Sequence, residues 1–145
     1  LATLAAYSFA WMRFPGRDAR FVAVFALQVV PIQVTLIPLL TLYADIGVAG
    51  TFWAVWISHT MFGLPLAVFL LHNFMREIPG ELIEAARVDG AAHVTVFFRL
   101  MLPLLKPALA AFGIYQFLWV WNDLLVALTF AGSSNTVAPM TVALF

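Results

Sequence analysis

Cysteine is absent from this sequence of 145 residues, and charged residues are scarce. Without cysteine there are no disulfides, no thiolate metal ligands and no cysteine nucleophile. Charged residues make up 10% of the chain, and seven Lys and Arg balance seven Asp and Glu. Because a nucleic-acid-binding surface needs an excess of basic residues, we expect no nucleic acid partner.

Apolar residues dominate the composition of the chain. Hydrophobic residues make up 64% of the chain, and the mean hydropathy is +1.01. These values lie outside the usual balance for a soluble domain. The composition therefore predicts a membrane protein, with the lipid bilayer as its surroundings.

Long stretches without charge predict spanning helices, since about 20 mainly apolar residues cross about 30 Å of hydrocarbon. The charge-free stretches are 21–44, 46–75, 107–122 and 124–145. They predict an all-α membrane bundle with about three complete spans, near 20–42, 50–73 and 105–130, and a partial span at each end. Because the chain begins and ends inside apolar runs, we expect residues 1–145 to form one partial transmembrane domain.

Three prolines, Pro31, Pro38 and Pro65, lie within the predicted spans. Proline lacks a backbone donor and bends a helix unless neighbours satisfy the carbonyl that it frees. We expect kinks there, which fit packing geometry better than a gating hinge.

The distribution of basic residues predicts the orientation of the chain. Arginines cluster in 13–20, and eight of the fourteen charged residues fall in 76–106, four of them basic. The connections 43–50 and 131–138 carry no basic residue. Because basic loops stay in the cytosol, we expect the 76–106 loop to be cytosolic and the two non-basic connections to face outward.

The 76–106 loop itself predicts two short helices. Glu81 and Glu84 suit the first turn of a helix, where the dipole favours negative charge. Asp89 and Gly90 then predict a turn, since glycine tolerates positive φ, and an amphipathic helix can follow over 91–102. One face of the first helix is predicted to dock a partner because its small residues permit close approach. It consists of Leu82, Ala85, Ala86 and Asp89.

The loop also resembles a known motif. The run Glu84-Ala85-Ala86-Arg87-Val88-Asp89-Gly90-Ala91, followed by Phe97, Phe98, Leu102-Pro103 and Pro107, is similar to the EAA loop of permease subunits of binding-protein-dependent ABC importers. Other segments resemble the maltose-type permeases of the carbohydrate-uptake group: Ala6-Tyr7-Ser8-Phe9-Ala10, Val30-Pro31, Ile37-Pro38-Leu39, Gly63-Leu64-Pro65 and Trp121-Asn122-Asp123.

This resemblance implies a multi-pass permease subunit in the plasma (inner) membrane of a prokaryote. It implies three kinds of partner: a cytosolic ATP-binding subunit dimer, a second permease subunit and an extracytoplasmic solute-binding protein. It also assigns coupling to the ATPase to Glu84, Ala85, Ala86, Asp89 and Gly90. From the residues alone, 79–102 is equally an interfacial amphipathic element that caps the bundle.

No feature of the sequence indicates an enzyme. The chain has no G-x-x-x-x-G-K-[ST] loop and no H-E-x-x-H spacing, so we expect no catalytic residue, metal or cofactor, and ATP hydrolysis on a partner subunit. The near absence of charge in the spans favours a sugar as solute. Glycerol phosphate, amino acids or peptides remain alternatives, as does a secondary transporter, which needs intramembrane charge for ion coupling.

The segment Trp121, Asn122 and Asp123 is a candidate pathway or gating element, because Asp123 is ionisable and lies in a predicted span. Tyr115, Trp119 and Trp121 suit either sugar stacking or packing and an interfacial belt at the membrane surface. We expect the Asn122 and Asp123 pair to serve structure or gating rather than direct solute contact, since a position near the outer interface explains a tolerated carboxylate.

The predicted orientation is testable because the chain has no native cysteine. Single cysteines at Ala92 and Ser134 should react with a membrane-impermeant thiol reagent from opposite sides of the bilayer. Labelling of both positions from one side would refute the topology.

Overall fold

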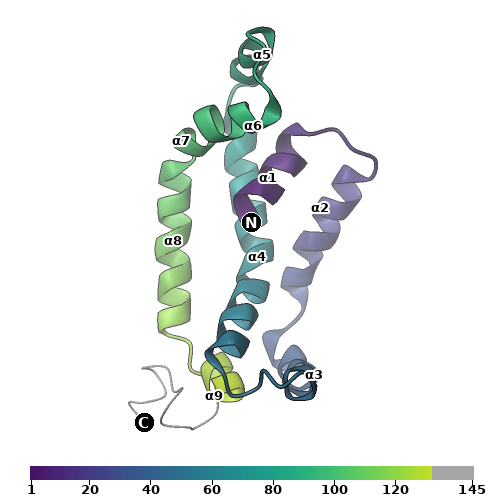
Figure 1. Cartoon of the computed structure of the whole chain (residues 1–145), viewed down its shortest axis with the longest axis vertical. Helices are drawn as coiled ribbons and strands as arrows, with labels where there is room; N and C mark the ends of the chain where they lie inside the picture. The colour runs from purple at the N-terminus through teal and green to yellow at the C-terminus, as the bar shows by residue number, and fades with distance from the viewer. Residues whose placement is uncertain (132–145) are drawn as a thin grey trace. The chain divides into compact units, whose positions relative to one another are not determined.

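The computed structural model describes residues 1–131, and every regular element within that range is a helix, as Figure 1 shows. The elements are α1 (Ala2–Trp11), α2 (Arg17–Ala26), the 3-10 turn η1 (Leu27–Val29), α3 (Ile32–Asp45), α4 (Phe52–Glu77), α5 (Gly80–Val88), α6 (His93–Val96), the π-helical η2 (Phe97–Met101), α7 (Leu102–Leu104), α8 (Lys106–Trp121) and α9 (Leu125–Ala131). The all-α prediction is confirmed for these residues.

The chain divides into two compact units. Unit 1 contains residues 1–25 and 65–114, and unit 2 contains residues 26–64 together with the segment from 115 onward. Helices α4 and α8 contribute residues to both units.

Helix α4 agrees with the predicted span at 50–73. It is 26 residues long, and an 18-residue window within it has a mean hydropathy of 1.8. At 1.5 Å per residue the helix extends about 39 Å, more than the hydrocarbon thickness. In the described part, α4 alone is long and apolar enough to cross a membrane. The number of candidate spans in the described residues rises to as many as three if each of two bent helix pairs counts as one span. These pairs are Arg17–Val29 with Ile32–Asp45, and His93–Leu104 with Lys106–Trp121.

The predicted span at 20–42 is divided into two helical parts, and the kink expected at Pro31 is a break in the helix. The chain is sharply bent between η1 and α3, where Val30 and Pro31 both have extended backbone, with ψ of 119° and 131°. A residue that precedes proline is pushed out of the α region, and proline itself has no amide proton to donate. Pro38 and Pro65, in contrast, lie inside the continuous helices α3 and α4.

The predicted span at 105–130 contains a break that the sequence did not predict. Helix α8 ends at Trp121, and α9 begins at Leu125. The predicted outward connection at 131–138 and the partial span at the C-terminal end lie, apart from residue 131, outside the described residues.

The core of unit 1 joins the predicted cytosolic loop to membrane helices. Ala6, Tyr7 and Ala10 of α1 pack with Leu71 and Met75 of α4. The loop and the start of α8 complete this buried cluster with Ile83, Val96, Phe97, Met101, Leu105 and Ala108. The 76–106 loop is therefore anchored on α1 and α4 by apolar contacts.

The core of unit 2 surrounds α9. Phe130 is fully buried and its ring lies 5.3 Å from the ring of Tyr43 in a T-shaped arrangement. The Tyr43 hydroxyl lies 3.1 Å from the Ser58 hydroxyl, and the backbone N–H of Gly50 donates to the Phe130 carbonyl. The remaining members of this core are Leu36, Ala54, Val55, Val126 and Ala131.

Removal of the Phe130 ring should therefore destabilise the protein far more than removal of an exposed ring. We expect Phe130→Ala to cost about 3 to 5 kcal/mol, because the neighbours cannot fill the cavity. Phe117→Ala is the matched control, since Phe117 is 60% exposed and should cost within about 0.5 kcal/mol. The measurement is thermal unfolding of each variant in lipid nanodiscs, and equal melting temperatures would contradict the packing described.

Candidate functional site

Two parts of the structure carry the residues that the sequence singles out. The first is the loop from α5 to α7, and the second is the break between α8 and α9. Figure 1 shows α5, α6 and α7 grouped at one end of unit 1.

Helix α5 begins at Gly80, one residue before the predicted start, directly after Pro79. Glu81 lies in its first turn and Arg87 in its last, which matches the sign of the helix dipole at each end. Both charges stabilise this helix at the places where its backbone groups lack intrahelical partners.

The predicted turn at Gly90 is confirmed. Gly90 has φ of +80°, and the N–H of Ala91 donates to the Ala86 carbonyl at 2.9 Å. The N–H of Gly90 itself donates to the Arg87 carbonyl at 2.9 Å. This is the glycine-terminated helix end in which a left-handed residue lets the following amides satisfy the last carbonyls.

The two sides of α5 have different surroundings. Ile83 is buried in the core of unit 1, and Ala86, three residues further on, is half-buried against the same core. Of the face predicted to dock a partner, Leu82, Ala85 and Asp89 are exposed, and Glu84 is exposed as well. Ala86 thus packs α5 against the core of unit 1, while the exposed residues of α5 remain accessible to a partner.

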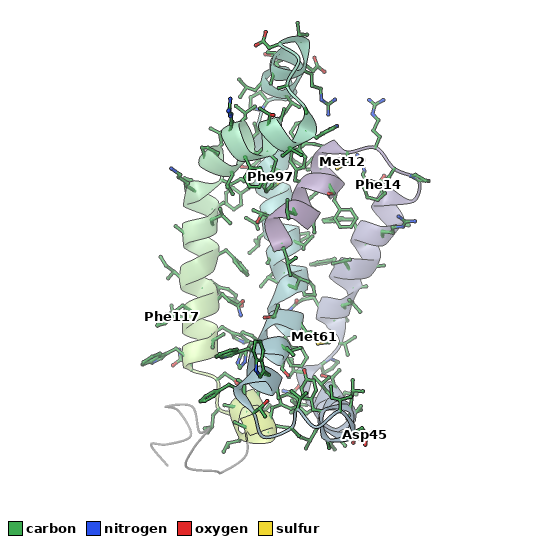
Figure 2. All side chains as sticks on the ribbon, viewed as in Figure 1. Met12, Phe14, Asp45, Met61, Phe97 and Phe117 are labelled. Atoms are coloured by element: carbon green, nitrogen blue, oxygen red, sulfur yellow. The ribbon has the colours of Figure 1, made fainter. Side chains whose placement is uncertain are left out.

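The second helical run of the loop, predicted over 91–102, extends from His93 to Leu104 through α6, η2 and α7. It is bound to α1 by polar and aromatic contacts. The Tyr7 hydroxyl lies 3.1 Å from His93 Nδ1, and the Tyr7 ring lies 5.3 Å from the ring of Phe97, which Figure 2 labels. The π-helical register of η2 places both Phe97 and Met101 in the core.

Side chains at the break between α8 and α9 satisfy the free backbone groups. The Asp123 carboxylate accepts from the N–H of Val126 at 3.4 Å and from the N–H of Ala127 at 3.1 Å, so it caps the start of α9. The Asn122 side-chain amide donates to the Leu118 carbonyl at 2.7 Å, which also accepts from the backbone N–H of Asn122 at 3.0 Å. The Asp123 carboxylate therefore explains why a helix can begin here.

His59 of α4 is the partner of Asp123 that the sequence did not reveal. Its Nδ1 donates to the Val55 carbonyl at 2.8 Å, and its Nε2 lies 3.2 Å from Asp123 Oδ2, although not in the direction of a good hydrogen bond. The side chains of His59 and Asp123 are 9% and 12% exposed.

A carbonyl oxygen only accepts, so Nδ1 of His59 carries a proton. Within the described residues, Nε2 makes no hydrogen bond, although it lies beside the carboxyl of Asp123. The described residues offer no group of three or more His, Asp or Glu side chains that could hold a metal ion.

The aromatic residues near the break fall on two sides of α8. Trp119 packs edge to face with His59, with ring centroids 5.5 Å apart, and it lines an open cleft of about 390 Å³. Trp121 stacks on Phe117 at 5.5 Å and is not among the cleft residues. The cleft is lined by Tyr115, Leu118, Trp119, Asn122 and Asp123. Among the predicted pathway residues, Asn122 and Asp123 reach this cleft.

Comparison with known proteins shows a match over residues 1–145 to the family described as "Binding-protein-dependent transport system inner membrane component". The chain is 56% identical over 144 residues to the osmoprotective compounds uptake permease protein of Synechocystis sp., covering 99% of this chain and 48% of that protein.

Two further relatives transport named solutes. The chain is 50% identical over 146 residues to the alpha-glucoside transport system permease protein of Rhizobium meliloti, covering 97% of this chain and 38% of that protein. It is 34% identical over 146 residues to the trehalose transport system permease protein of Mycobacterium tuberculosis, covering 100% of this chain and 53% of that protein. The chain thus spans about half the length of these curated relatives, or less.

The His59 and Asp123 pair should contribute to stability only when both members are present. We expect His59→Leu to lower the free energy of unfolding by about 1 to 3 kcal/mol, because it removes the imidazole that lies beside the buried carboxyl of Asp123. Adding Asp123→Asn to that variant should recover part of the loss, since the amide needs no compensating charge. The measurement is a double-mutant cycle on thermal unfolding in nanodiscs. Strictly additive effects would show that the two side chains do not interact.

Proposed function

Because this chain belongs to the family of inner membrane components of binding-protein-dependent transport systems, we propose that it is part of a permease subunit that forms the solute pathway of an ATP-driven importer. Members of this family are transport permeases and not enzymes, and the chain is a membrane protein. In this proposal, residues 1–145 are one partial transmembrane permease domain, and 76–106 is its cytosolic coupling loop.

The solute that we propose is a sugar or a related neutral polyhydroxyl compound. The observation that supports it is the set of relatives, whose names specify uptake of osmoprotective compounds, alpha-glucosides and trehalose. The charge distribution is consistent with it, because the segment 26–64 and the segment from 115 onward contain no Lys or Arg. A phosphate or carboxylate solute generally needs such a cation for recognition.

We propose that the loop couples transport to ATP hydrolysis through Glu84, Ala85, Ala86, Asp89 and Gly90. Four of these residues are exposed, so a partner subunit could contact them: Glu84, Ala85, Asp89 and Gly90. Ala86 instead packs against the core of unit 1 and attaches α5 to it. Because Ile83 and Phe97 lie in one core with Tyr7 and Met75, a force on α5 would be transmitted to α1 and α4.

The proposed setting is the plasma (inner) membrane of a prokaryote, with a multi-pass topology and the 76–106 loop in the cytosol. A cytosolic ATP-binding subunit dimer would dock on the loop. A second permease subunit would complete the pathway, and an extracytoplasmic solute-binding protein would deliver the solute. The family description supports the last partner directly, since it names transport that depends on a binding protein.

The break between α8 and α9 is proposed to serve structure and gating. Asp123 caps α9 and pairs with His59, so its carboxylate supports the fold. Trp121, stacked on Phe117, is proposed to act through packing.

Uptake by the assembled complex in proteoliposomes tests the function, and Gly90 tests the coupling. We expect Gly90→Val to insert normally but to lower ATP-driven uptake of trehalose, because a β-branched residue at φ of +80° is strained by about 1 to 2 kcal/mol. Gly90→Asn is the matched control, since asparagine tolerates the left-handed region and should retain most of the uptake. No atom lies within 4 Å of a Cβ added at this position. A loss of uptake in Gly90→Val would therefore result from backbone strain and not from a steric clash.

If Gly90→Val supported uptake at the wild-type rate, the coupling role of this turn would be wrong. A wild-type complex that imports neither trehalose nor maltose would instead contradict the proposed sugar function.

A further inference from the structure

Helices α2 and α4 each carry one boundary between charged and apolar sequence. In α2 the last charged residue is Arg20, and in α4 the first Lys, Arg, Asp or Glu is Arg76. The charge-free stretches 21–44 and 46–75 adjoin these two arginines. In a membrane protein, such a boundary marks the level at which a helix leaves the hydrocarbon.

Ring contacts within unit 1 bring the two boundaries close to one level. The rings of Phe21 and His72 lie 4.2 Å apart, and the rings of Phe25 and Phe69 stack at 4.3 Å. The partner on α4 moves towards the start of that helix as α2 advances, so the two helices run antiparallel here. The charged start of α2 therefore lies beside the charged end of α4.

Three arginines gather at this level. Arg17 precedes Phe21 by one helical turn, and Arg76 follows His72 by one turn, both on the charged side of the ring contact. The charges of Arg17 and Arg76 both act on the His72 imidazole, so both side chains lie near it. Arg20 shares a face of α2 with Arg17, because positions i and i+3 are neighbours on a helix.

Most of this positive charge is not neutralised within the protein. Asp18 accepts from Nε of Arg17 at 2.9 Å and thereby engages one of its three guanidinium nitrogens. In the part of the chain that the structure describes, no carboxylate forms an ion pair with Arg20 or Arg76, and both arginines are exposed. Glu77 follows Arg76, but adjacent residues on a helix point in different directions.

Exposed apolar side chains adjoin the arginines on the membrane side. Val22 and Phe25 of α2 and Phe74 of α4 are all exposed, and they lie within about two turns of the arginines along their own helices. Guanidinium groups bind phosphate through paired, charge-assisted hydrogen bonds. A ligand that uses both layers must have an anionic phosphate at one end and hydrocarbon at the other, which describes a phospholipid and not a free phosphate.

We propose that Arg17, Arg20 and Arg76 bind the headgroup phosphate of an anionic phospholipid, whose acyl chains lie along Val22 and Phe25. A zwitterionic lipid suits the site less well, because its ammonium group would add a cation to three arginines. The site lies at the membrane surface of unit 1, and its lipid would link the start of α2 to the end of α4.

Lipid binding to the purified chain tests this site. Arg20→Gln and Arg76→Gln each remove one cation from it, and Arg99→Gln is the matched control, because Arg99 is also exposed but belongs to η2. The protein in detergent is titrated with phosphatidylglycerol or phosphatidylcholine, and bound lipid is counted by native mass spectrometry. Glycerol 3-phosphate is the competing anion without acyl chains.

We expect Arg20→Gln and Arg76→Gln each to weaken phosphatidylglycerol binding about fivefold, which corresponds to about 1 kcal/mol per arginine near a membrane surface. Arg99→Gln should bind phosphatidylglycerol as tightly as the wild type does. All four proteins should bind phosphatidylcholine equally and more weakly, and glycerol 3-phosphate at the concentration of the lipid should displace none of it.

Equal weakening by Arg99→Gln would show that overall charge alone attracts the lipid, and it would overturn the site. Equal binding of the two lipids by the wild type would do the same, and displacement by glycerol 3-phosphate would reveal a site for a free anion. A lower melting temperature of Arg20→Gln or Arg76→Gln in phosphatidylcholine nanodiscs would show that the arginine supports the fold, and would also contradict the proposal. None of these outcomes bears on the proposed function, which uptake tests separately.

Discussion

The hydrogen bonding of the backbone at helix ends is the constraint on which the rest of this structure depends. In lipid, a free N–H or carbonyl costs several kcal/mol, so a helix can stop only where side chains or other backbone groups replace the missing partners. Asp123 supplies two acceptors for the start of α9, and Asn122 supplies a donor at the end of α8. These polar residues in an apolar sequence allow the chain to turn and to form the cleft.

The sequence predicted those features that depend on local chemistry. The class of the fold, the long helix α4, the first loop helix and the positive φ of Gly90 all follow from charge spacing, end charges and glycine. Proline predicted the kink at Pro31, but the break between α8 and α9 was missed, because hydropathy averages over a window and does not register a capping carboxylate. The contact between His59 and Asp123 was missed because it joins residues far apart in sequence, and no spacing rule brings them together.

The two units differ sharply in charge. All seven Lys and Arg of the chain lie in residues 1–25 and 65–114, which form unit 1, together with the loop that we propose to couple to the ATPase. Basic residues in that unit fit a cytosolic face, where they meet water and anionic headgroups. Unit 2 has no Lys or Arg, and in it the ring of His59 lies beside the carboxyl of Asp123.

The two units also differ in the interactions that hold their parts together. The loop is held to α1 and α4 by a core of fully buried side chains, including Met75, Ile83 and Met101, which is a stiff connection suited to transmitting movement. The start of α9 depends instead on two backbone N–H groups that donate to a single carboxylate, that of Asp123. Apolar packing thus fixes the loop in unit 1, whereas one polar side chain fixes the helix break in unit 2.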